Sequence, residues 1–273
     1  MTARLSGRDL SVAYGERVVV RDLDIDVFDR TTTAVIGPNG CGKSTLLRAL
    51  GRLMPARRGH VLLDGQRIDR MPTREVARLL GLLPQSPTAP DGITVADLVS
   101  LGRHPHQSWY RQWSGDDERA VSEALAWTGI SELADRPVDA LSGGQRQRAW
   151  ISMALAQGTE LLLLDEPTTY LDLAHQIDVL DLVERMHTER GRTVVMVLHD
   201  LNLAARYADR LVAMKDGRIV ASGPPAQVLT VDLLRDVFGL QARLLDDPVT
   251  GTPMVVPVAR RPRGEVANVA STS

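Results

Sequence analysis

The chain has 273 residues, of which 44% are hydrophobic and 24% charged, a balance typical of a globular protein with enough apolar side chains for a core. Its formal net charge of -2 excludes a general basic field for nucleic acid, and its single cysteine, Cys41, excludes a disulfide framework or a cysteine-rich zinc module. No apolar run reaches the roughly 18 residues that a membrane span needs, and the charged first ten residues lack the apolar stretch of a secretion signal. We therefore expect a soluble protein of a reducing compartment, and if it serves a membrane, it does so through partners.

Paired strands and a following helix are expected in the first part of the chain. Apolar and polar residues alternate from the start, and a threonine-rich run from Thr31 suits a buried strand that ends at glycine. Leucines recur at helical spacing from Leu46, and Asp64-Gly65 is typical of a hairpin turn. The expected elements are strands over 5–14, 18–26 and 31–37, a helix over 43–53, a hairpin over 61–68, a helix over 73–80 and a strand over 81–84.

The pattern changes at residue 86, after which helical periodicity continues to about residue 140 without strand runs. Ser114, with Asp117 three residues later, resembles a helix-capping box. Beyond this segment, apolar strands alternate with helices, which implies a parallel sheet covered on both faces. The expected elements there are a helix over 145–157, a strand over 161–164, a helix over 174–189, a strand over 193–198, a hairpin over 211–221, a helix over 225–238 and a disordered tail over 259–273.

Residues 37–44 fit the G-x-x-x-x-G-K-[ST] phosphate loop, at an expected strand end and helix start. Glycines let backbone N–H groups turn inward, and the helix N-terminus adds positive potential for phosphate. Lys43 can reach the β- and γ-phosphates, and the Ser44 hydroxyl can ligate Mg²⁺. Chance would produce such a match in roughly one chain per thousand of this composition, so a nucleotide site is the stronger interpretation. The expected nucleotide-binding residues are Gly37, Pro38, Asn39, Gly40, Cys41, Gly42, Lys43, Ser44 and Thr45.

The apolar strand over 161–164 ends in two carboxylates, Asp165 and Glu166. They fall at the carboxyl edge of the expected sheet, where open α/β sheets bind ligands. Asp165 would hold Mg²⁺ through water, and Glu166 could polarise the attacking water. By itself, a strand followed by Asp-Glu is more often a solvated loop. Beside a phosphate loop, the catalytic interpretation is favoured.

A glycine-rich string, Leu141-Ser142-Gly143-Gly144-Gln145, leads into the helix that precedes this strand. By itself it could be a flexible helix start. The phosphate loop, this string and the strand ending at Asp165, in that order, resemble the ATP-binding subunits of ABC transporters, whose signature is Leu-Ser-Gly-Gly-Gln. The resemblance covers Leu5 to about Pro257.

The resemblance implies an α/β P-loop NTPase with a mixed or parallel sheet core, an N-terminal antiparallel β subdomain and an inserted helical subdomain. The implied division is a single ATPase domain over 1–258, with a RecA-like core at 1–85 and 141–240 and the helical subdomain at about 86–140. ATP and Mg²⁺ are the implied ligands. The family pattern also implies a head-to-tail dimer, in which one copy closes on the γ-phosphate held by the other through Ser142, Gly143, Gly144 and Gln145. A lone glycine-rich helix N-terminus is indeed half of an anion site until it faces a phosphate.

Four further residues stand where the family would place them. Tyr14 resembles the aromatic residue that stacks on adenine, and Gln85 resembles the glutamine that contacts Mg²⁺ and the attacking water. Asp172 resembles the loop that crosses the dimer interface, and His199 the histidine that senses the γ-phosphate. The structural alternatives are a strand-packing tyrosine, an exposed glutamine, a helix N-cap and a satisfied histidine at a strand end.

The resemblance thus implies two overlapping sets of residues. The implied catalytic residues are Glu166, His199, Lys43 and Gln85. The implied Mg²⁺ ligands are Ser44, Gln85 and Asp165. The other histidines lack metal-ligand spacing, and we expect His104 and His106 at the surface of a loop.

Four segments of the chain resemble one particular subgroup of the ABC transporter ATPases. Segments 101–107, 168–176, 198–202 and 247–253 look like those of iron(III)–siderophore importer ATPases of the ferric enterobactin, ferric dicitrate and ferrichrome type; close relatives import haem or vitamin B12. The implied place is peripheral, on the cytoplasmic face of the membrane. The implied partners are a second copy, integral membrane permeases and, indirectly, an extracytoplasmic siderophore-binding protein, with no nucleic acid. One departure is Asp29-Arg30, where the family more often has a glycine-containing turn.

The competing class is a soluble ATPase of the same family that acts on DNA or ribosomes. Such proteins usually interrupt the cassette with a long coiled coil or fuse two cassettes. Here the stretch between Lys43 and Ser142 has no heptads, and the sequence holds one cassette. A nucleotide-binding regulator without turnover would most simply lack the carboxylate at Glu166, which is present. The sequence therefore favours a transporter ATPase.

Overall fold

The computed structural model describes residues 3–107 and 113–258, so the expected tail over 259–273 lies outside the described residues. The strands are β1 Ala3–Tyr14, β2 Arg17–Phe28, β3 Thr32–Ile36, β4 Arg58–Leu63, β5 Gln66–Arg67, β6 Leu80–Leu83, β7 Leu161–Leu164, β8 Thr193–Val197, β9 Arg210–Lys215, β10 Arg218–Gly223, β11 Ala242–Asp246 and β12 Pro253–Pro257. The α-helices are α1 Lys43–Leu50, α2 Thr73–Leu79, α3 Val95–Leu101, α4 Gly115–Thr128, α5 Gly143–Ala156, α6 Leu173–Arg190, α7 Leu201–Tyr207, α8 Pro225–Val228 and α9 Val231–Phe238. Short 3-10 helices lie at Ile68–Arg70, His104–His106, Ser131–Leu133 and Val138–Ala140.

The central sheet has the strand order β10-β9-β3-β8-β7-β6. Neighbouring strands from β9 to β6 are parallel, and β10 pairs with β9 in the antiparallel sense. Every residue of β3, β7 and β8 is buried, which is why these strands read as continuous apolar or threonine-rich runs. The predicted α/β class is confirmed, and of the expected mixed or parallel sheet the structure has the mixed form.

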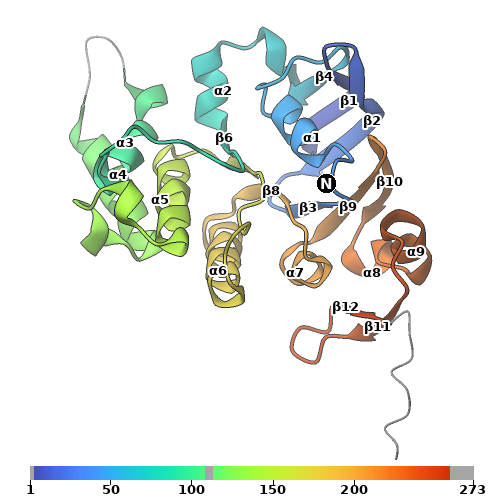
Figure 1. Cartoon of the computed structure of the whole chain (residues 1–273). Coiled ribbons are helices and arrows are strands. Elements are labelled where there is room, and N and C mark those ends of the chain that lie inside the picture. Colours follow the sequence, from blue (N-terminus) through green and yellow to red (C-terminus); the bar gives the residue numbers. More distant parts are fainter. Residues whose placement is uncertain (1–2, 108–112, 259–273) are drawn as a thin grey trace, which may run out of the picture.

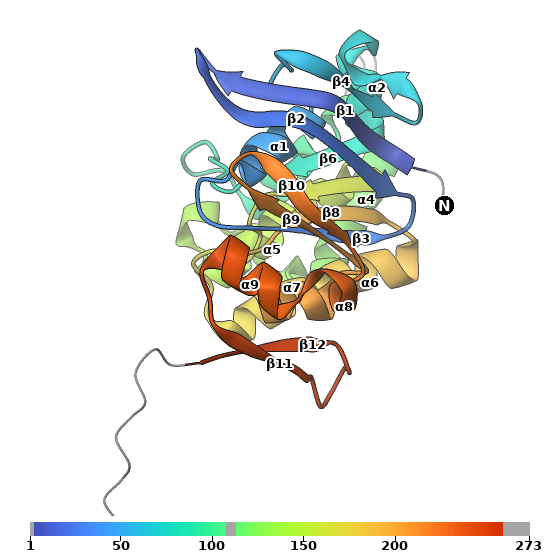
Figure 2. The same ribbon diagram turned by 90° about the vertical axis from the view of Figure 1, so that its right-hand side faces the viewer.

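Side chains that alternate along β7 enter two different hydrophobic clusters. Leu161 and Leu163 pack on the face covered by α1 and the antiparallel sheet β2-β1-β4-β5, whereas Leu162 and Leu164 pack on the face covered by α5, α6 and α7. Figure 2 shows these layers from the antiparallel sheet at the top to the β11-β12 hairpin at the bottom. Both faces of the sheet are thus buried, so a ligand would have to bind at the ends of the strands.

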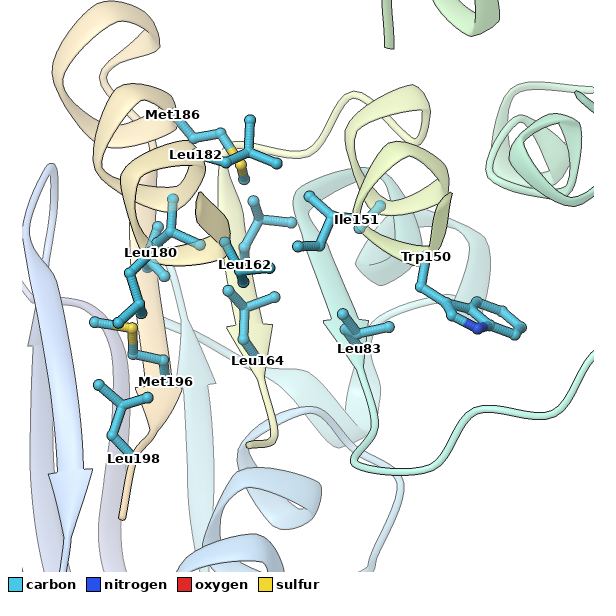
Figure 3. Packing of buried hydrophobic residues seen from close by; sticks show 14 of the residues in the cluster. Leu83, Trp150, Ile151, Leu162, Leu164, Leu180, Leu182, Met186, Met196 and Leu198 are labelled. Atoms are coloured by element: carbon cyan, nitrogen blue, oxygen red, sulfur yellow. The ribbon is translucent and has the colours of Figure 1, made fainter. Parts of the chain in front are cut away.

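The helix-covered face holds the packing beneath the expected catalytic strand ends (Figure 3). Leu162 of β7 lies among side chains from α5 and α6, including Ile151 and Leu180, and all three are fully buried. Such a site leaves little room to relax after truncation, because its neighbours come from separate rigid elements.

Replacing Leu162 with alanine should lower the free energy of unfolding by about 2–5 kcal/mol, through lost apolar burial and the cavity that remains. Leu245 of β11 is 52% exposed, so the same substitution there should change stability by about 0.5 kcal/mol or less. Urea unfolding followed by circular dichroism measures both. Equal losses at the two positions would contradict the assigned core.

The described residues between β6 and α5 form a helical lobe that stands to one side of the antiparallel sheet (Figure 1). The expected capping box at the start of α4 is confirmed, since the Ser114 and Asp117 side chains each accept from the other's backbone N–H. Trp127 of α4 stacks against Arg185 and Arg190 of α6, each guanidinium 4.5 Å from the ring centroid. The lobe is therefore fastened to the core by cation–π contacts as well as by α5.

The C-terminal part of the chain differs from the sequence prediction. The helix expected over 225–238 is divided into α8 and α9, because Thr230 leaves the helical conformation and caps α9 through the Leu233 N–H. The antiparallel β11-β12 hairpin was not predicted. It is held to α7 by Asn202, whose Oδ1 accepts from the Val255 N–H at 2.7 Å and whose amide donates to the Val255 carbonyl at 3.3 Å.

Two smaller predictions also change. The helix expected over 43–53 ends at Leu50, with Gly51 as its C-cap. His106 is not a surface loop residue: it lies in a 3-10 helix, is half-buried and its Nε2 is 2.8 Å from the carbonyl oxygen of Gln157. His104 is exposed, as predicted.

The Asp29-Arg30 turn shows how the chain accommodates its departure from a glycine-containing turn. Arg30 has a φ of +51°, in the left-handed region that favours glycine. Its backbone N–H donates to Thr193 Oγ1 at 2.8 Å, and that hydroxyl donates to Asp29 Oδ1 at 3.1 Å. These hydrogen bonds to Thr193, at the start of β8, stabilise the left-handed conformation of Arg30, which glycine would adopt without strain.

Candidate nucleotide site

The phosphate loop connects β3 to α1 through glycines with left-handed or more unusual backbone angles. Gly37, Gly40 and Gly42 have φ values of +152°, +77° and +107°. A Cβ on Gly37 would lie 2.3 Å from the Met214 carbonyl oxygen of β9, so the loop can pass this strand only without a side chain. Gly42 is the N-cap of α1, and the first helical N–H groups are left for an anion.

Lys43 lies across this loop and is only 5% exposed. Its Nζ donates to the carbonyl oxygens of Gly37 at 2.9 Å and Pro38 at 3.1 Å. The ammonium group and the N-terminus of α1 thus place positive charge on the same side of the loop. This arrangement is suited to a polyphosphate.

A cavity of about 390 Å³ opens over the loop. The residues predicted for the nucleotide site that line it are Asn39, Gly40, Gly42, Lys43, Ser44, Thr45, Gln85, Glu166 and His199. Val19, Thr169 and Tyr170 line it as well and were not predicted. Gln85, Glu166 and His199 follow β6, β7 and β8, and they converge because parallel strands end at one edge of the sheet.

Glu166 is the meeting point of three side chains. Its Oε1 lies 2.7 Å from Nε2 of His199, and its Oε2 accepts from the Gln85 amide at 2.6 Å and from the Thr169 hydroxyl at 2.9 Å. Glu166 also has a φ of +54°, which is uncommon for a residue with a side chain. Strained backbone of this kind is concentrated at functional sites, because surrounding contacts are needed to maintain it.

Asp165 is 2% exposed, and neither of its carboxylate oxygens has a hydrogen-bond partner among the described residues. Burial raises the pKa of its carboxyl, against the opposing effects of the nearby Ser44 hydroxyl and Arg48 guanidinium. An orphaned carboxylate beside a hydroxyl fits a hard cation. Among the described residues, no group of three or more His, Cys, Asp or Glu side chains could hold a metal ion.

The remaining predicted site residues lie outside the lining of this cavity. Tyr14 is 48% exposed, and its hydroxyl lies 3.4 Å from Nη1 of Arg48 on α1. Ser142 caps α5 in a capping box with Gln145, and Asp172 caps α6. The predicted site residues that line the cavity come from the phosphate loop and from the strand ends. Thr169 was missed, since only its position three residues after Glu166 could have indicated it.

Cys41 belongs to the phosphate loop, and its side chain is buried in the cluster between α1 and the antiparallel sheet. Burial raises the pKa of its thiol, although the cationic Lys43 opposes this effect. At neutral pH the thiolate is correspondingly scarce, and the sulfur is shielded from reagents.

We expect N-ethylmaleimide to modify Cys41 at least about tenfold more slowly in the native protein than after unfolding in urea. Full modification should abolish ATP binding, because the adduct would crowd the phosphate loop. Mass spectrometry measures the first rate, and fluorescence of an ATP analogue measures the binding. A fast native reaction, or unchanged ATP binding by the fully modified protein, would contradict the assigned position.

A glycine-rich turn between a parallel strand and a helix, a lysine folded across it and an acidic pair at a neighbouring strand end define a P-loop nucleoside triphosphatase. The family profile described as "ABC transporter" matches residues 20–169, and the chain belongs to this family. It is accordingly an ATP-binding ATPase of the kind that is coupled to transport. Among the described residues, no helix combines the length and apolar character needed to cross a membrane.

Curated relatives match nearly the whole chain. The ferric enterobactin transport ATP-binding protein FepC of Escherichia coli (strain K12) is 53% identical over 258 residues, 94% of this chain and 95% of that protein. The iron(3+)-hydroxamate import ATP-binding protein FhuC of Bacillus subtilis (strain 168) is 51% identical over 250 residues, 92% and 93% of the two chains. The hemin import ATP-binding protein HmuV of Rhodococcus jostii (strain RHA1) is 42% identical over 258 residues, 94% and 86%.

Solved structures agree with the fold. A metal-chelate type ABC transporter in an inward-facing conformation contains a chain that is similar with a TM-score of 0.82 at 29% identity, over 95% of this chain and 98% of that one. A bacterial ABC transporter cassette solved as a dimer is similar with a TM-score of 0.72 at 26% identity, over 81% and 98%.

Proposed function

We propose that this chain is the ATP-hydrolysing subunit that energises import of an iron(III)–siderophore complex across the cytoplasmic membrane. The observation that carries the cargo assignment is the difference in identity among relatives. Identity exceeds 50% over more than 90% of both chains for FepC and FhuC, named for ferric enterobactin and iron(3+)-hydroxamate, and it is 42% for HmuV, named for hemin. The alternative is the same role in a haem or vitamin B12 importer.

Within one copy, the P-loop binds the phosphates of ATP. Lys43 exchanges its two carbonyl partners for the β- and γ-phosphates, and the loop N–H groups and the N-terminus of α1 bind the remaining oxygens. Ser44, Gln85 and Asp165 would hold Mg²⁺, which neutralises phosphate charge when it is bound. Glu166 orients and polarises the attacking water, and His199 and Gln85 position this carboxylate from either side.

A second copy completes the site. The N-terminus of α5, with Ser142, Gly143, Gly144 and Gln145, is exposed or half-exposed apart from Gly144 and supplies helix-dipole potential for a γ-phosphate. Asp172 ends the loop that leads into α6, beside the start of α5. The exposed ring of Tyr14 is available to stack on adenine. This function requires the two copies to bind head to tail around ATP.

The whole ATPase is proposed to be a single domain over 1–258, with a RecA-like core at 1–85 and 141–240 and a helical subdomain at about 86–140. The helical lobe docks integral membrane permeases from the cytoplasmic face, as a peripheral subunit. An extracytoplasmic siderophore-binding protein delivers the cargo to those permeases. Coupling is mechanical, since closure of the dimer around ATP moves the lobe.

Uptake of radioactive ferric siderophores in the native cell tests the cargo, with the wild-type chain compared with Lys43→Ala. The chain's other lysine provides a matched control: Lys215 of β9 bonds the Asp236 carbonyl, away from the cavity, and Lys215→Ala should import normally. Loss of uptake of a siderophore in Lys43→Ala alone supports the proposal. Normal uptake of every siderophore, together with loss of haem or cobalamin uptake, would show that the cargo is haem or cobalamin and not a siderophore.

A further inference from the structure

His175, in the first turn of α6, joins the two loops that the proposed dimer places at its interface. Its ring packs on Gly144 at the start of α5, and its Nδ1 lies 2.6 Å from Oδ1 of Asp172. These two contacts reach the signature loop and the interface loop from a single side chain. In the sequence, His175 stands within the 168–176 segment, but nothing there assigns it a role.

The contact with Gly144 is close enough to explain why this position of the signature is glycine. A Cβ built there would lie 2.4 Å from Cδ2 of His175 and 3.1 Å from its Cγ. The His175 ring therefore occupies the space that a side chain at this position would need. The N-terminus of α5 therefore packs directly against the imidazole ring of His175 on α6.

The contact with Asp172 fixes the other loop. One oxygen of Asp172 accepts from both the backbone N–H and the ring of His175, at 3.0 and 2.6 Å. These donors lower the pKa of the Asp172 carboxyl, the backbone N–H being the larger cause. The side chain of Asp172 is thus held toward α6, although it is 69% exposed.

Further contacts between the same segments lie on both sides of the His175 contacts with Gly144 and Asp172. Arg148 and Asp178 form an ion pair of 2.6 Å between α5 and α6, about one helical turn further along each helix. Leu171 lies 3.6 Å from where a Cβ of Gly143 would stand. The loop from Glu166 to Asp172 therefore connects the catalytic carboxylate to the signature loop of the same copy.

We propose that His175 is a positioning residue that holds the signature loop and the loop at Asp172 in one fixed arrangement, so that both meet the second copy together. The inference rests on the proposed head-to-tail dimer. Without the His175 ring, the start of α5 would have free space beside Gly144, and each loop would have to be ordered separately when the dimer closes. The cost of that ordering falls on dimer formation and leaves ATP binding to the separate copy unchanged.

The test uses full-length protein that carries Glu166→Gln, so that ATP-bound dimers are not lost through hydrolysis. Two variants separate the contacts: His175→Phe keeps a ring beside Gly144 without the bond to Asp172, and His175→Asn keeps an N–H donor without the ring. His187→Asn, further along α6 and away from both loops, is the matched control. Sedimentation velocity with Mg-ATP gives the protein concentration of half-dimerisation, and a fluorescent ATP analogue gives the affinity of the separate copy.

We expect one or both His175 variants to need about tenfold more protein for half-dimerisation, with ATP affinity and circular dichroism unchanged and the His187 variant normal. A loss in one variant alone supports the inference and identifies the ring or the hydrogen bond as the important contact. Unchanged dimerisation in both variants, or a loss accompanied by weaker ATP binding or altered folding, would overturn it. If the parent Glu166→Gln protein does not dimerise with ATP, the proposed dimer itself fails, which is a separate result.

Discussion

Replacing Glu166 with glutamine is expected to lower the steady-state rate of ATP hydrolysis by roughly 10²–10⁴-fold, the contribution typical of a positioned general base. Glutamine preserves the size of the side chain and can still accept from Gln85 and Thr169, which now hold the carboxylate at 2.6 and 2.9 Å. It removes the negative charge that, in the proposed mechanism, draws a proton from the attacking water. ATP affinity should remain within a few-fold of the wild-type value.

Phosphate release at saturating ATP measures the rate, and equilibrium binding of a fluorescent ATP analogue measures the affinity. Glu123→Gln is the matched control, because Glu123 is an exposed carboxylate on α4, away from the cavity. Hydrolysis by Glu166→Gln within tenfold of wild type would transfer the role of base to another group. Loss of hydrolysis in the control as well would indicate a general effect of charge.

Replacing Asp165 with asparagine should have opposite effects on activity and on stability. Burial raises the pKa of this carboxyl in the folded protein, so the folded state disfavours the charged form. The folded protein then binds more protons than the unfolded chain, and this group's contribution to stability falls as pH rises from its unfolded pKa through its folded pKa. Asp165→Asn removes that penalty and, at the same time, removes the proposed Mg²⁺ ligand.

At pH 7 without nucleotide or metal, we expect the melting temperature of Asp165→Asn to exceed that of wild type by about 2–4 °C, the effect of roughly 1 kcal/mol in a chain of this size. The difference should shrink below the unfolded pKa of aspartate, where the wild-type carboxyl is protonated in both states. The rate of Mg-ATP hydrolysis by Asp165→Asn should fall at least about 100-fold. Calorimetry from acid to neutral pH follows the first effect. A melting temperature below that of wild type at pH 7 would show that the carboxylate has a stabilising partner.

The phosphate loop and the acidic strand end were predictable because their chemistry depends on residues close together in the chain. The spacing from Gly37 to Ser44 specifies a turn and a helix N-terminus, and the apolar run before Asp165 specifies a buried strand whose end faces ligands. The alternation of strands and helices predicts a parallel sheet, and the antiparallel strand β10, which makes the sheet mixed, corresponds to the hairpin expected over 211–221. The division of α8 from α9 was missed because Thr230 fits a helical pattern and also makes a good N-cap.

Contacts between distant segments could not be predicted from spacing. Thr169 reaches Glu166 because the loop after β7 turns back on itself, and His175 meets Gly144 because α5 and α6 lie side by side. The β11-β12 hairpin depends on Asn202 of α7, 53 residues away from Val255 in the chain. The sequence by itself determined the phosphate loop and the kind of ligand, since these depend on local backbone geometry and charge, and the class of protein followed from its resemblance to ABC transporter ATPases. Only the tertiary structure decided which side chains hold Glu166 and which ring packs on Gly144, because those contacts form between elements that packing alone brings together.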